Sequence, residues 1–237
     1  MSPKPEFDRY AQKYSELLQV PLRHGFVRDE KFYHARKWIL MADFLGRHMP
    51  RRNDLAWLDV GCGKGELLNY GRSHFGRVAG CDLSREMVRE ASGLEVHLQE
   101  APAVLPFAAA SFDFVTAVCV YHHVEEPNRI PLTREIQRIL RPAGVFCMIE
   151  HNPFNPVTRL IVKQCPVDVD AHLLTAVSAR RYARAAGLNP METQYFLYLP
   201  EKHYARIPWM ERSLKHVPLG GQYAIFAQKG FNERGTA

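Results

Sequence analysis

A glycine-rich turn between an apolar segment and a helix-like segment is the part of this sequence best suited to hold a ligand. It lies in WLDVGCGKGELL, residues 57–68, where Gly61, Gly63 and Gly65 alternate with other residues. Glycine allows turns that other residues resist and lets the backbone approach a ligand closely. A dinucleotide, a nucleoside triphosphate or another ligand would fit such a turn.

Neither polyphosphate-binding motif is complete in this turn. A P-loop needs a serine or threonine directly after its lysine, but Lys64 is followed by Gly65 and Glu66. When the dinucleotide fingerprint G-x-G-x-x-G is aligned from Gly61, Glu66 takes the place of its third glycine. The carboxylate of Glu66 would repel a pyrophosphate. Both polyphosphate ligands are therefore disfavoured.

Two carboxylates flank the turn and indicate a different ligand. Asp59 precedes it, and Asp82 ends the next predicted strand in GCDLS. Asp82 can accept hydrogen bonds from both ribose hydroxyls, and Asp59 suits a ligand with positive charge. In an α/β sheet both would lie beyond the carboxyl ends of the strands, where ligands bind. A ligand with a ribose, cationic groups and no phosphate fits, and S-adenosyl-L-methionine has these properties.

The sequence resembles the class I S-adenosylmethionine-dependent methyltransferases, especially the small-molecule branch that includes the ubiquinone-biosynthesis methyltransferases. The blocks that carry the resemblance span roughly residues 55–150: LDVGCGKGE, GCDLSREMV, LPFAAASFDFV, YHHV and EIQRILRPAGVF. The segment SARRYARAAGL and the last predicted strand extend it further. The resemblance implies a methyltransferase that uses S-adenosyl-L-methionine.

The resemblance also implies roles for individual residues at the cofactor site. Gly61, Gly63 and Gly65 would approach the methionine part, Asp59 would anchor the turn near the amino group, and Asp82 would bind the ribose. Apolar or sulfur-bearing side chains would contact the rest of the cofactor: Leu83 and Met87 near the adenine, and Cys119 near the sulfonium.

Two further cofactor contacts are open to alternatives. The acidic residue that often holds the adenine amino group in this family is replaced by Ala101, so either the adjacent Glu100 or the backbone would take this role. The N-terminal FDRYAQKYSELL resembles a segment that folds over the cofactor, with Tyr14 as a candidate aromatic contact, although helix packing explains Tyr14 equally well.

Three histidines could act on an acceptor. Methyl transfer is an in-line displacement in which the protein mainly aligns the reactants, but a hydroxyl acceptor benefits from a base, and histidine suits this near neutral pH. His122 and His123 follow the fourth predicted strand and His151 follows the fifth. Each could instead hold a loop by a hydrogen bond. We expect an oxygen acceptor first, and carbon or nitrogen next.

An asparagine–proline pair after the fifth predicted strand raises a different acceptor class. Base and amide methyltransferases carry an Asn/Asp-Pro-Pro-aromatic motif after strand four, but Asn152-Pro153-Phe154 stands after strand five and lacks the second proline. Asn-Pro commonly forms turns. Methylation of bases or amides is therefore disfavoured.

Alternating strand and helix patterns must position these residues. They predict an α/β fold with a doubly wound, seven-stranded, Rossmann-like sheet whose last strand is antiparallel. Helices are expected at residues 6–20 and 29–48, and after Ser178 as a cap. The strands are expected at 56–60, 77–81, 95–99, 112–120, 145–149, 192–199 and 221–229.

The predicted elements divide the chain into two parts. We expect an N-terminal helical cap over residues 1–52 and a methyltransferase core over 53–237. Irregular insertions are expected at 152–176, over the top of the sheet, and at 200–219.

Composition limits the partners and the cellular location. The 237 residues carry a formal net charge of +6 and five cysteines without a C-x-x-C pair, so no metal site is predicted. No apolar run approaches the ~20 residues of a membrane span, and the N-terminus lacks a secretory pattern. We expect a cytoplasmic location and a small-molecule acceptor, with nucleic acid and membrane partners disfavoured. A tRNA methyltransferase and a catalytically silent cofactor-binding protein remain the alternatives, and the oligomeric state is open.

Overall fold

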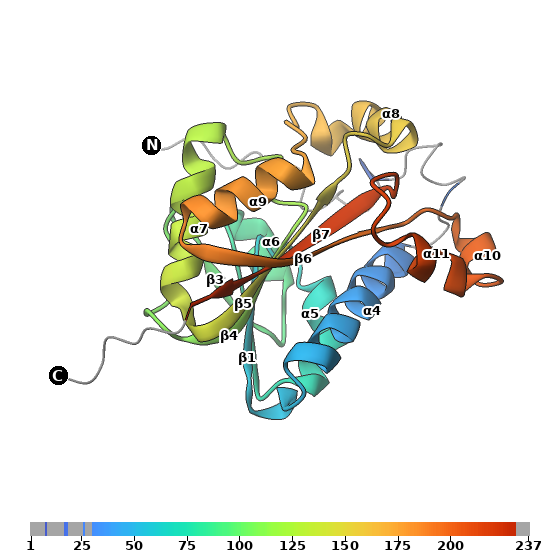
Figure 1. Ribbon diagram of the computed structural model, residues 1–237. Helices are drawn as coiled ribbons and strands as arrows, with labels where there is room; N and C mark the ends of the chain where they lie inside the picture. The colour runs from blue at the N-terminus through green and yellow to red at the C-terminus, as the bar shows by residue number, and fades with distance from the viewer. Residues whose placement is uncertain (1–7, 9–16, 19–25, 27–29, 231–237) are drawn as a thin grey trace.

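A seven-stranded sheet forms the centre of the computed structural model, which describes residues 8, 17–18, 26 and 30–230 (Figure 1). The strand order is β3-β2-β1-β4-β5-β7-β6, and only β7 runs antiparallel to its neighbours. The predicted doubly wound fold is confirmed. The strands are β1 Ala56–Val60, β2 Arg77–Asp82, β3 Glu95–Leu98, β4 Phe112–Val118, β5 Leu140–His151, β6 Leu188–Phe196 and β7 Gln222–Lys229.

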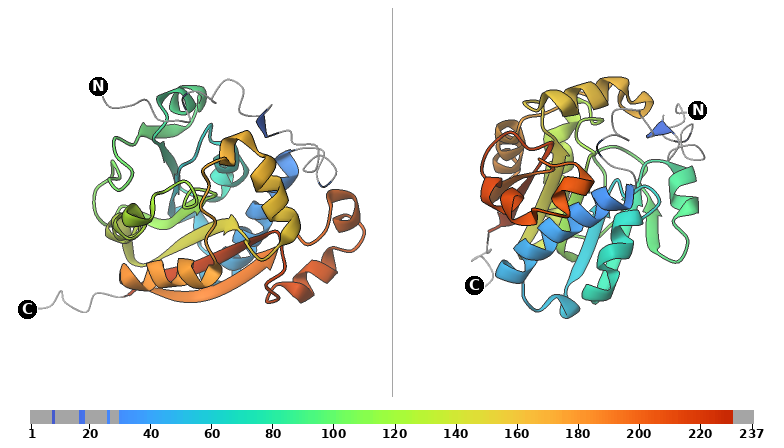
Figure 2. Two further views of the ribbon diagram at one scale, coloured as in Figure 1. Left: turned by 90° about the horizontal axis from the view of Figure 1, so that it is seen from above. Right: turned by 90° about the vertical axis from the view of Figure 1, so that its right-hand side faces the viewer.

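Helices cover both faces of this sheet, as the views in Figures 1 and 2 show. The helices are α4 Glu30–His48, α5 Glu66–Gly71, α6 Arg85–Glu90, α7 Glu126–Ile139, α8 Pro156–Gln164, α9 Ala176–Ala185, α10 Glu201–Tyr204 and α11 Pro208–Leu214, and the short 3-10 helices are η2 Arg52–Asp54, η3 Arg72–His74 and η4 Pro166–Asp168. Helices α7 and α9 pack on one face of the sheet, and α4 and α5 lie on the other.

Alternation along β1 divides the interior into two cores. Successive side chains of a strand point to opposite faces, so Leu58 joins the core beneath α7 and α9, while Trp57 joins the core beneath α4. Every residue of β1 is buried, as expected for a central parallel strand covered on both sides.

Helix α4 confirms the helix predicted at 29–48 and packs directly against the sheet. Its Met41, Phe44 and Leu45 are fully buried, and the ring of Phe44 stacks on that of Phe226 with centroids 3.8 Å apart. The division of the chain near residue 52 stays a prediction. Most of the helix predicted at 6–20 lies outside the described residues.

The segment 152–176, predicted to be irregular, contains a helix, and this prediction was wrong. Asn155 caps α8 by accepting a hydrogen bond from Thr158 N at 2.9 Å, and Pro156 occupies the first turn, where its missing N–H costs nothing. The prolines were therefore start signals rather than breakers. The next helix, α9, is capped by Thr175 instead of Ser178: Thr175 Oγ1 accepts from Ser178 N at 3.1 Å.

Two strands begin several residues before their predicted starts. Strand β5 begins at Leu140, directly after α7, because Leu140 already has an extended backbone at the end of that helix. Strand β6 begins at Leu188, just after Gly187, whose φ of 82° reverses the chain at the end of α9. As predicted, β6 and β7 form an antiparallel pair at the sheet edge.

In the described part of the chain, no helix combines the length and apolar character needed to cross a membrane.

Candidate functional site

A cavity of about 610 Å³ opens at the carboxyl ends of the parallel strands. Strands β1 and β4 are adjacent and parallel. The sheet continues from β1 through β2 to β3 on one side and from β4 to β5 on the other, so the strand order reverses between β1 and β4. Doubly wound sheets bind their ligands at such a point, and the volume falls in the range of small-molecule sites. Asp59, Gly63 and Asp82 line one part of the cavity, and His123 and His151 line another.

The glycine turn is held by backbone hydrogen bonds and leaves one glycine open to the cavity. Gly61 N and Cys62 N both donate to Cys81 O, at 2.8 and 3.1 Å. Gly63 has a φ of 54°, and a Cβ added there would meet no atom within 4 Å. This small residue therefore presents bare backbone to the cavity.

The other two glycines of the turn are required by packing. A Cβ on Gly61 would lie 2.5 Å from Val120, and one on Gly65 would lie 2.3 Å from Leu94. Gly61 lines the cavity, but Gly65 does not. Gly65 instead occupies the position before α5 with a φ of 78°, so its expected approach to the ligand finds no support in the structure.

Asp82 joins the glycine turn to the next loop. Its carboxylate accepts hydrogen bonds from Gly63 N at 2.9 Å and from Ser84 N at 2.8 Å. Burial raises the pKa of Asp82, and the hydrogen bonds from Ser84 and Gly63 oppose this rise. Each oxygen of a carboxylate can accept more than one hydrogen bond. Asp82 therefore retains acceptor capacity for a ligand in the cavity.

Asp59 lies at the base of the cavity in a hydrogen-bonded chain. Trp57 Nε1 donates to Thr116 Oγ1 at 2.9 Å, and that hydroxyl donates to Asp59 Oδ1 at 2.5 Å. Burial raises the pKa of Asp59 to about 7, against the lowering effects of the Thr116 hydrogen bond and the charge of Lys37. A cationic ligand group beside Asp59 would favour its ionised form.

Cys119 lies where β4 ends, with a φ of 58° that is uncommon for a residue with a side chain. Its Sγ is 3.9 Å from Lys37 Nζ and 3.4 Å from Gln222 Nε2. Burial disfavours the thiolate, but the charges of Lys37 and His151 outweigh it and lower the pKa of Cys119 to about 7. The cavity therefore contains an ionisable thiol.

A buried carboxylate organises the loop after β4. Glu150 Oε1 accepts from Val120 N at 3.0 Å and from Tyr121 N at 2.7 Å, and Glu150 Oε2 lies 2.5 Å from His122 Nδ1. Burial would lower the pKa of His122, but the charge of Glu150 and the hydrogen bond with Asp168 raise it to about 10. Without another cation, His122 therefore holds a proton at neutral pH.

Asp168 of η4 brings the two adjacent histidines together from the far side of the cavity. Its Oδ1 lies 3.5 Å from His122 Nε2 and 3.3 Å from His123 Nε2. The two histidines hold the pKa of Asp168 far below its usual range, although burial acts in the opposite direction. Desolvation by burial lowers the pKa of His123.

His151 stands apart from this cluster at the end of β5. It is partly buried and lines the same cavity. Its Nδ1 lies 3.4 Å from Gln222 Nε2, and its ring centroid is 5.2 Å from that of His122. All three histidines nominated from the sequence therefore face one cavity.

Of the residues predicted to contact the adenine, only some line the cavity. Leu83 and Met87 line the cavity, and their contact with the adenine stays a prediction. Glu100 is exposed, and Ala101, which forms an isolated bridge with Val104, is not among the lining residues. Gln99, which ends the third predicted strand, lines the cavity here together with Pro102. Tyr14 lies outside the described residues.

Gln99 and Lys37 are among the lining residues that the sequence reasoning missed. Gln99 donates to Ala101 O and Pro102 O at 2.8 and 3.0 Å, and the strand-end rule that found Asp82 could have found it. Lys37 looked like an ordinary charge on a surface helix, and nothing in the sequence marks it as buried.

Comparison with known proteins shows which proteins this chain is similar to. A model described as a methyltransferase domain matches residues 58–148. The 27-O-demethylrifamycin SV methyltransferase of Amycolatopsis mediterranei is 30% identical over 148 residues, which cover 58% of this chain and 54% of that protein. The chain thus matches about half the length of that curated relative.

A second relative and a solved structure extend the match over more of the chain. The ubiquinone biosynthesis O-methyltransferase of Ralstonia nicotianae is 28% identical over 181 residues, 71% of this chain and 69% of that protein. A SAM-dependent methyltransferase from Archaeoglobus fulgidus superposes with a TM-score of 0.63 at 17% identity, covering 87% of this chain and 97% of that one.

Proposed function

The chain is a member of the class I S-adenosylmethionine-dependent methyltransferases, and we propose that it transfers a methyl group to a hydroxyl oxygen of a small organic acceptor. The observation that carries this proposal is the single cavity. It joins the Asp82–Gly63 turn to a group of histidines that could receive an acceptor proton. The named O-methyltransferases among the relatives support an oxygen acceptor.

The residues present fit the cofactor of this family. The open backbone at Gly63 provides room for the methionine part, and the spare acceptor capacity of Asp82 suits a ribose diol. Asp59 would hold the amino group. Leu83 and Met87 provide an apolar surface for the adenine. When bound, S-adenosylmethionine supplies an electrophilic methyl group on a sulfonium sulfur.

His151 is the histidine best placed to act as the base. Without another cation, the charge of Glu150 and the hydrogen bond with Asp168 keep the proton on His122. His123 faces Asp168, whereas His151 is partly exposed in the cavity. His151 would remove the proton of the acceptor hydroxyl while the new oxygen–carbon bond forms. S-adenosylmethionine would supply the methyl group, with S-adenosylhomocysteine as the leaving group, and His151 would hold the proton taken from the acceptor.

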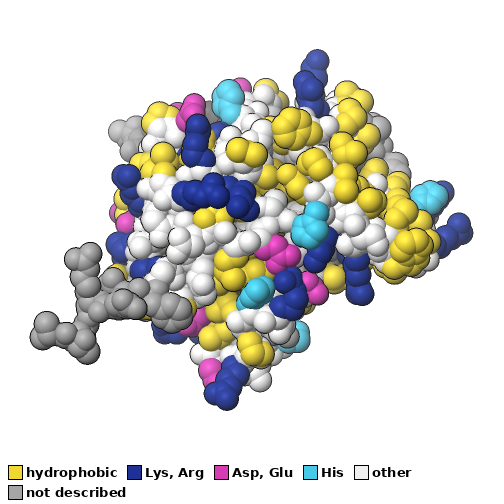
Figure 3. Space-filling view, viewed as in Figure 1, with side chains coloured by type: hydrophobic (Ala, Val, Ile, Leu, Met, Phe, Trp, Pro, Cys, Tyr) yellow, Lys and Arg dark blue, Asp and Glu magenta, His cyan; other side chains and the backbone are white. Residues whose placement is uncertain are grey.

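An apolar wall indicates the character of the acceptor. Val157 and Ile161 of α8 line the cavity, while Phe154 and Leu160 lie exposed nearby in sequence. Figure 3 shows hydrophobic side chains gathered over the α8 region. An acceptor with a substantial apolar body fits such a wall better than a highly charged polymer does.

Two alternatives remain from the sequence. A tRNA substrate is suggested by the net charge of +6, and it would require RNA binding that weakens steeply as salt rises. A silent cofactor-binding protein would bind S-adenosylhomocysteine and transfer no methyl group. Both alternatives predict outcomes that differ from the proposal.

The test uses an isotope-labelled methyl donor, a panel of hydroxylated aromatic and aliphatic compounds, and bulk tRNA. We expect label in a base-stable ether of a small compound and none in RNA. Replacing His151 with Gln should lower kcat by about 100-fold or more, the usual contribution of a general base, while S-adenosylhomocysteine affinity stays nearly unchanged. The exposed His203, changed to Gln, serves as the matched control.

Label found on nitrogen, carbon or RNA would contradict O-methylation. An unchanged rate in His151→Gln would show that His151 has a structural role and does not act as the base. Tight S-adenosylhomocysteine binding without any labelled product would favour the silent cofactor-binding protein.

A further inference from the structure

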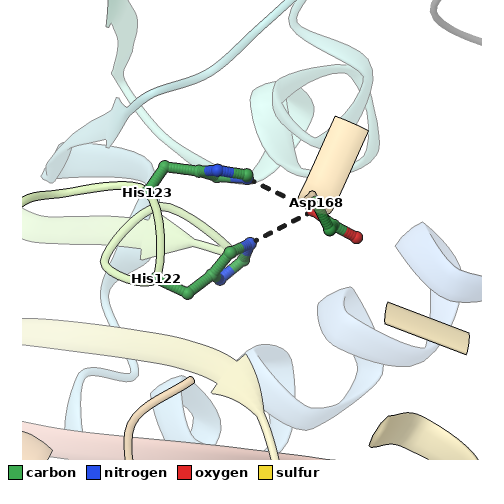
Figure 4. A group of neighbouring side chains, drawn as sticks. All are labelled: His122, His123 and Asp168. Atoms are coloured by element: carbon green, nitrogen blue, oxygen red, sulfur yellow. Dashed lines mark ion pairs between the residues drawn. The ribbon is translucent and has the colours of Figure 1, made fainter. Parts of the chain in front are cut away.

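Three potential ligand atoms converge at the acceptor end of the cavity. Figure 4 shows the rings of His122 and His123 both directed at Asp168. The two Nε2 atoms lie 3.5 and 3.3 Å from the same Asp168 Oδ1, and the three atoms all lie within 4.8 Å of one another. Four ligands at about 2.0–2.1 Å around a tetrahedral ion lie about 3.3–3.4 Å apart. Two of the three separations therefore already suit a shared ion.

The surrounding structure fixes the orientation of the first imidazole. The Nδ1–H of His122 donates to the buried Glu150, whose other oxygen is held by the backbone N–H groups of Val120 and Tyr121. Metal-binding histidines commonly donate their second ring N–H to a carboxylate in this way. The arrangement leaves Nε2 of His122 aimed at Asp168.

The cluster also has an electrostatic requirement. Two unprotonated imidazole nitrogens would repel a carboxylate oxygen that both of them face, because all three atoms present lone pairs. Either each nitrogen carries a proton, or one cation lies among the three atoms. A metal-binding measurement separates these two states.

We propose that His122, His123 and Asp168 form a binding site for a divalent first-row transition-metal ion such as zinc. Two imidazoles and one carboxylate suit zinc, cobalt or iron, whereas magnesium and calcium prefer oxygen ligands throughout. All three residues line the cavity, so further coordination positions would open toward it, as in catalytic zinc sites.

The location connects this site to the acceptor. An oxygen donor of the acceptor would complete the coordination and lose its proton more readily to His151, whose ring lies beside that of His122. This role depends on the proposed function, whereas binding of the ion does not.

The test measures the ion directly on the full chain, without an affinity tag, a methyl donor or an acceptor. After treatment with a chelator and dialysis, the protein is titrated with Co²⁺ and followed by visible absorption. We expect one ion per chain, displacement by Zn²⁺, and no competition from Mg²⁺. His123→Asn and Asp168→Asn should each abolish stoichiometric binding, and Glu150→Gln should weaken it by roughly 10- to 100-fold.

The exposed His97, which pairs with Glu95 at the other edge of the sheet, gives the control variant His97→Gln and should bind cobalt like the wild type. Calorimetry with S-adenosylhomocysteine on every variant shows, independently of metal binding, whether the variant is folded and has an intact cofactor site. Absence of cobalt binding by the wild type, or unchanged affinity in both His123→Asn and Asp168→Asn, would overturn the proposal. The cluster would then hold protons instead of an ion, and the proposed methyl transfer would still stand or fall on its own test.

Discussion

At the scale of single residues, Cys119 shows how the fold alters the chemistry of one side chain. The residue follows β4, and its Sγ is close to Lys37 Nζ from α4 and to Gln222 Nε2 from β7. A thiol becomes nucleophilic only as the thiolate. The charges of Lys37 and His151 outweigh burial and lower the pKa of Cys119 to about 7, so its reactivity reports the electrostatics of the cavity.

Alkylation of Cys119 by iodoacetamide should follow a pH midpoint near 7. Lys37→Met removes a positive charge that favours the thiolate, so the midpoint should move upward, whereas Lys37→Arg should keep it low. Mass spectrometry of peptides measures the rate at each pH. Cys81 is an internal control, because burial raises the pKa of its thiol. A midpoint near 9 in the wild type would show that Lys37 and His151 do not act on Cys119 as described.

The residues of the site were predicted from the sequence to unequal degrees. Asp82 could be predicted because it follows the glycine turn and ends a strand, and both signals lie in the local sequence. Asp168 could not be predicted, because its contact with His123 depends on how η4 lies across the cavity. Lys37 could not be predicted either, because the sequence does not distinguish a buried lysine from an exposed one on the same helix.

At the scale of elements, α4 supports the site through its packing. The helix places Lys37 at the cavity and buries Phe44 against Phe226 of β7. Removing a fully buried phenylalanine ring leaves a cavity among neighbours that relax only partly.

Phe44→Ala should therefore reduce the free energy of unfolding by about 3–5 kcal/mol. Denaturant titration followed by circular dichroism measures the change. Ile39 lies on the same helix with 45% of its surface exposed, so Ile39→Ala should stay within about 0.5 kcal/mol of the wild type. A loss below 1 kcal/mol in Phe44→Ala would mean that α4 contributes little to the folded core.

The elements themselves could largely be predicted, and the exceptions have physical causes. Strands β1 and β2 were found nearly to the residue because β1 ends at the glycine turn and β2 lies between Gly76 and Ser84, which caps α6. Helix α8 was missed because its prolines resemble breakers, although Pro156 occupies the first turn. The start of α9 was misplaced because Thr175 and Ser178 are both good caps, and only the structure shows which one accepts the hydrogen bond.

At the scale of the whole molecule, the cavity couples ligand binding to global stability. Its lining comes from strands on both sides of the centre of the sheet, β2 as well as β7, and from α4 and α8 outside the sheet. A ligand held by all of these elements binds only the folded chain. Folding and binding are then linked by mass action.

This linkage makes stability a measure of the cofactor site without any knowledge of the acceptor. S-adenosylhomocysteine at 100 times its Kd should add about 2.7 kcal/mol to the free energy of unfolding. Asp82→Asn removes one charged acceptor, which should weaken binding by about 1.5–3 kcal/mol. At the same ligand concentration the added stability should then fall to about 0.3–1.3 kcal/mol. Thermal unfolding with and without ligand, in both proteins, measures the difference.

The substituted amide keeps the shape of the side chain and one acceptor oxygen, so at least one of the hydrogen bonds from Gly63 N and Ser84 N can persist. The amide nitrogen then faces the other backbone N–H, so the ligand-free variant should itself lose about 1–3 kcal/mol of stability. The stabilisation that the ligand adds is therefore compared within each protein, which separates damage to the turn from loss of binding. Equal ligand-induced stabilisation in the two proteins would show that Asp82 only braces the turn. The ribose would then need another partner, and Gln99, which lines the cavity, would be the next residue to change.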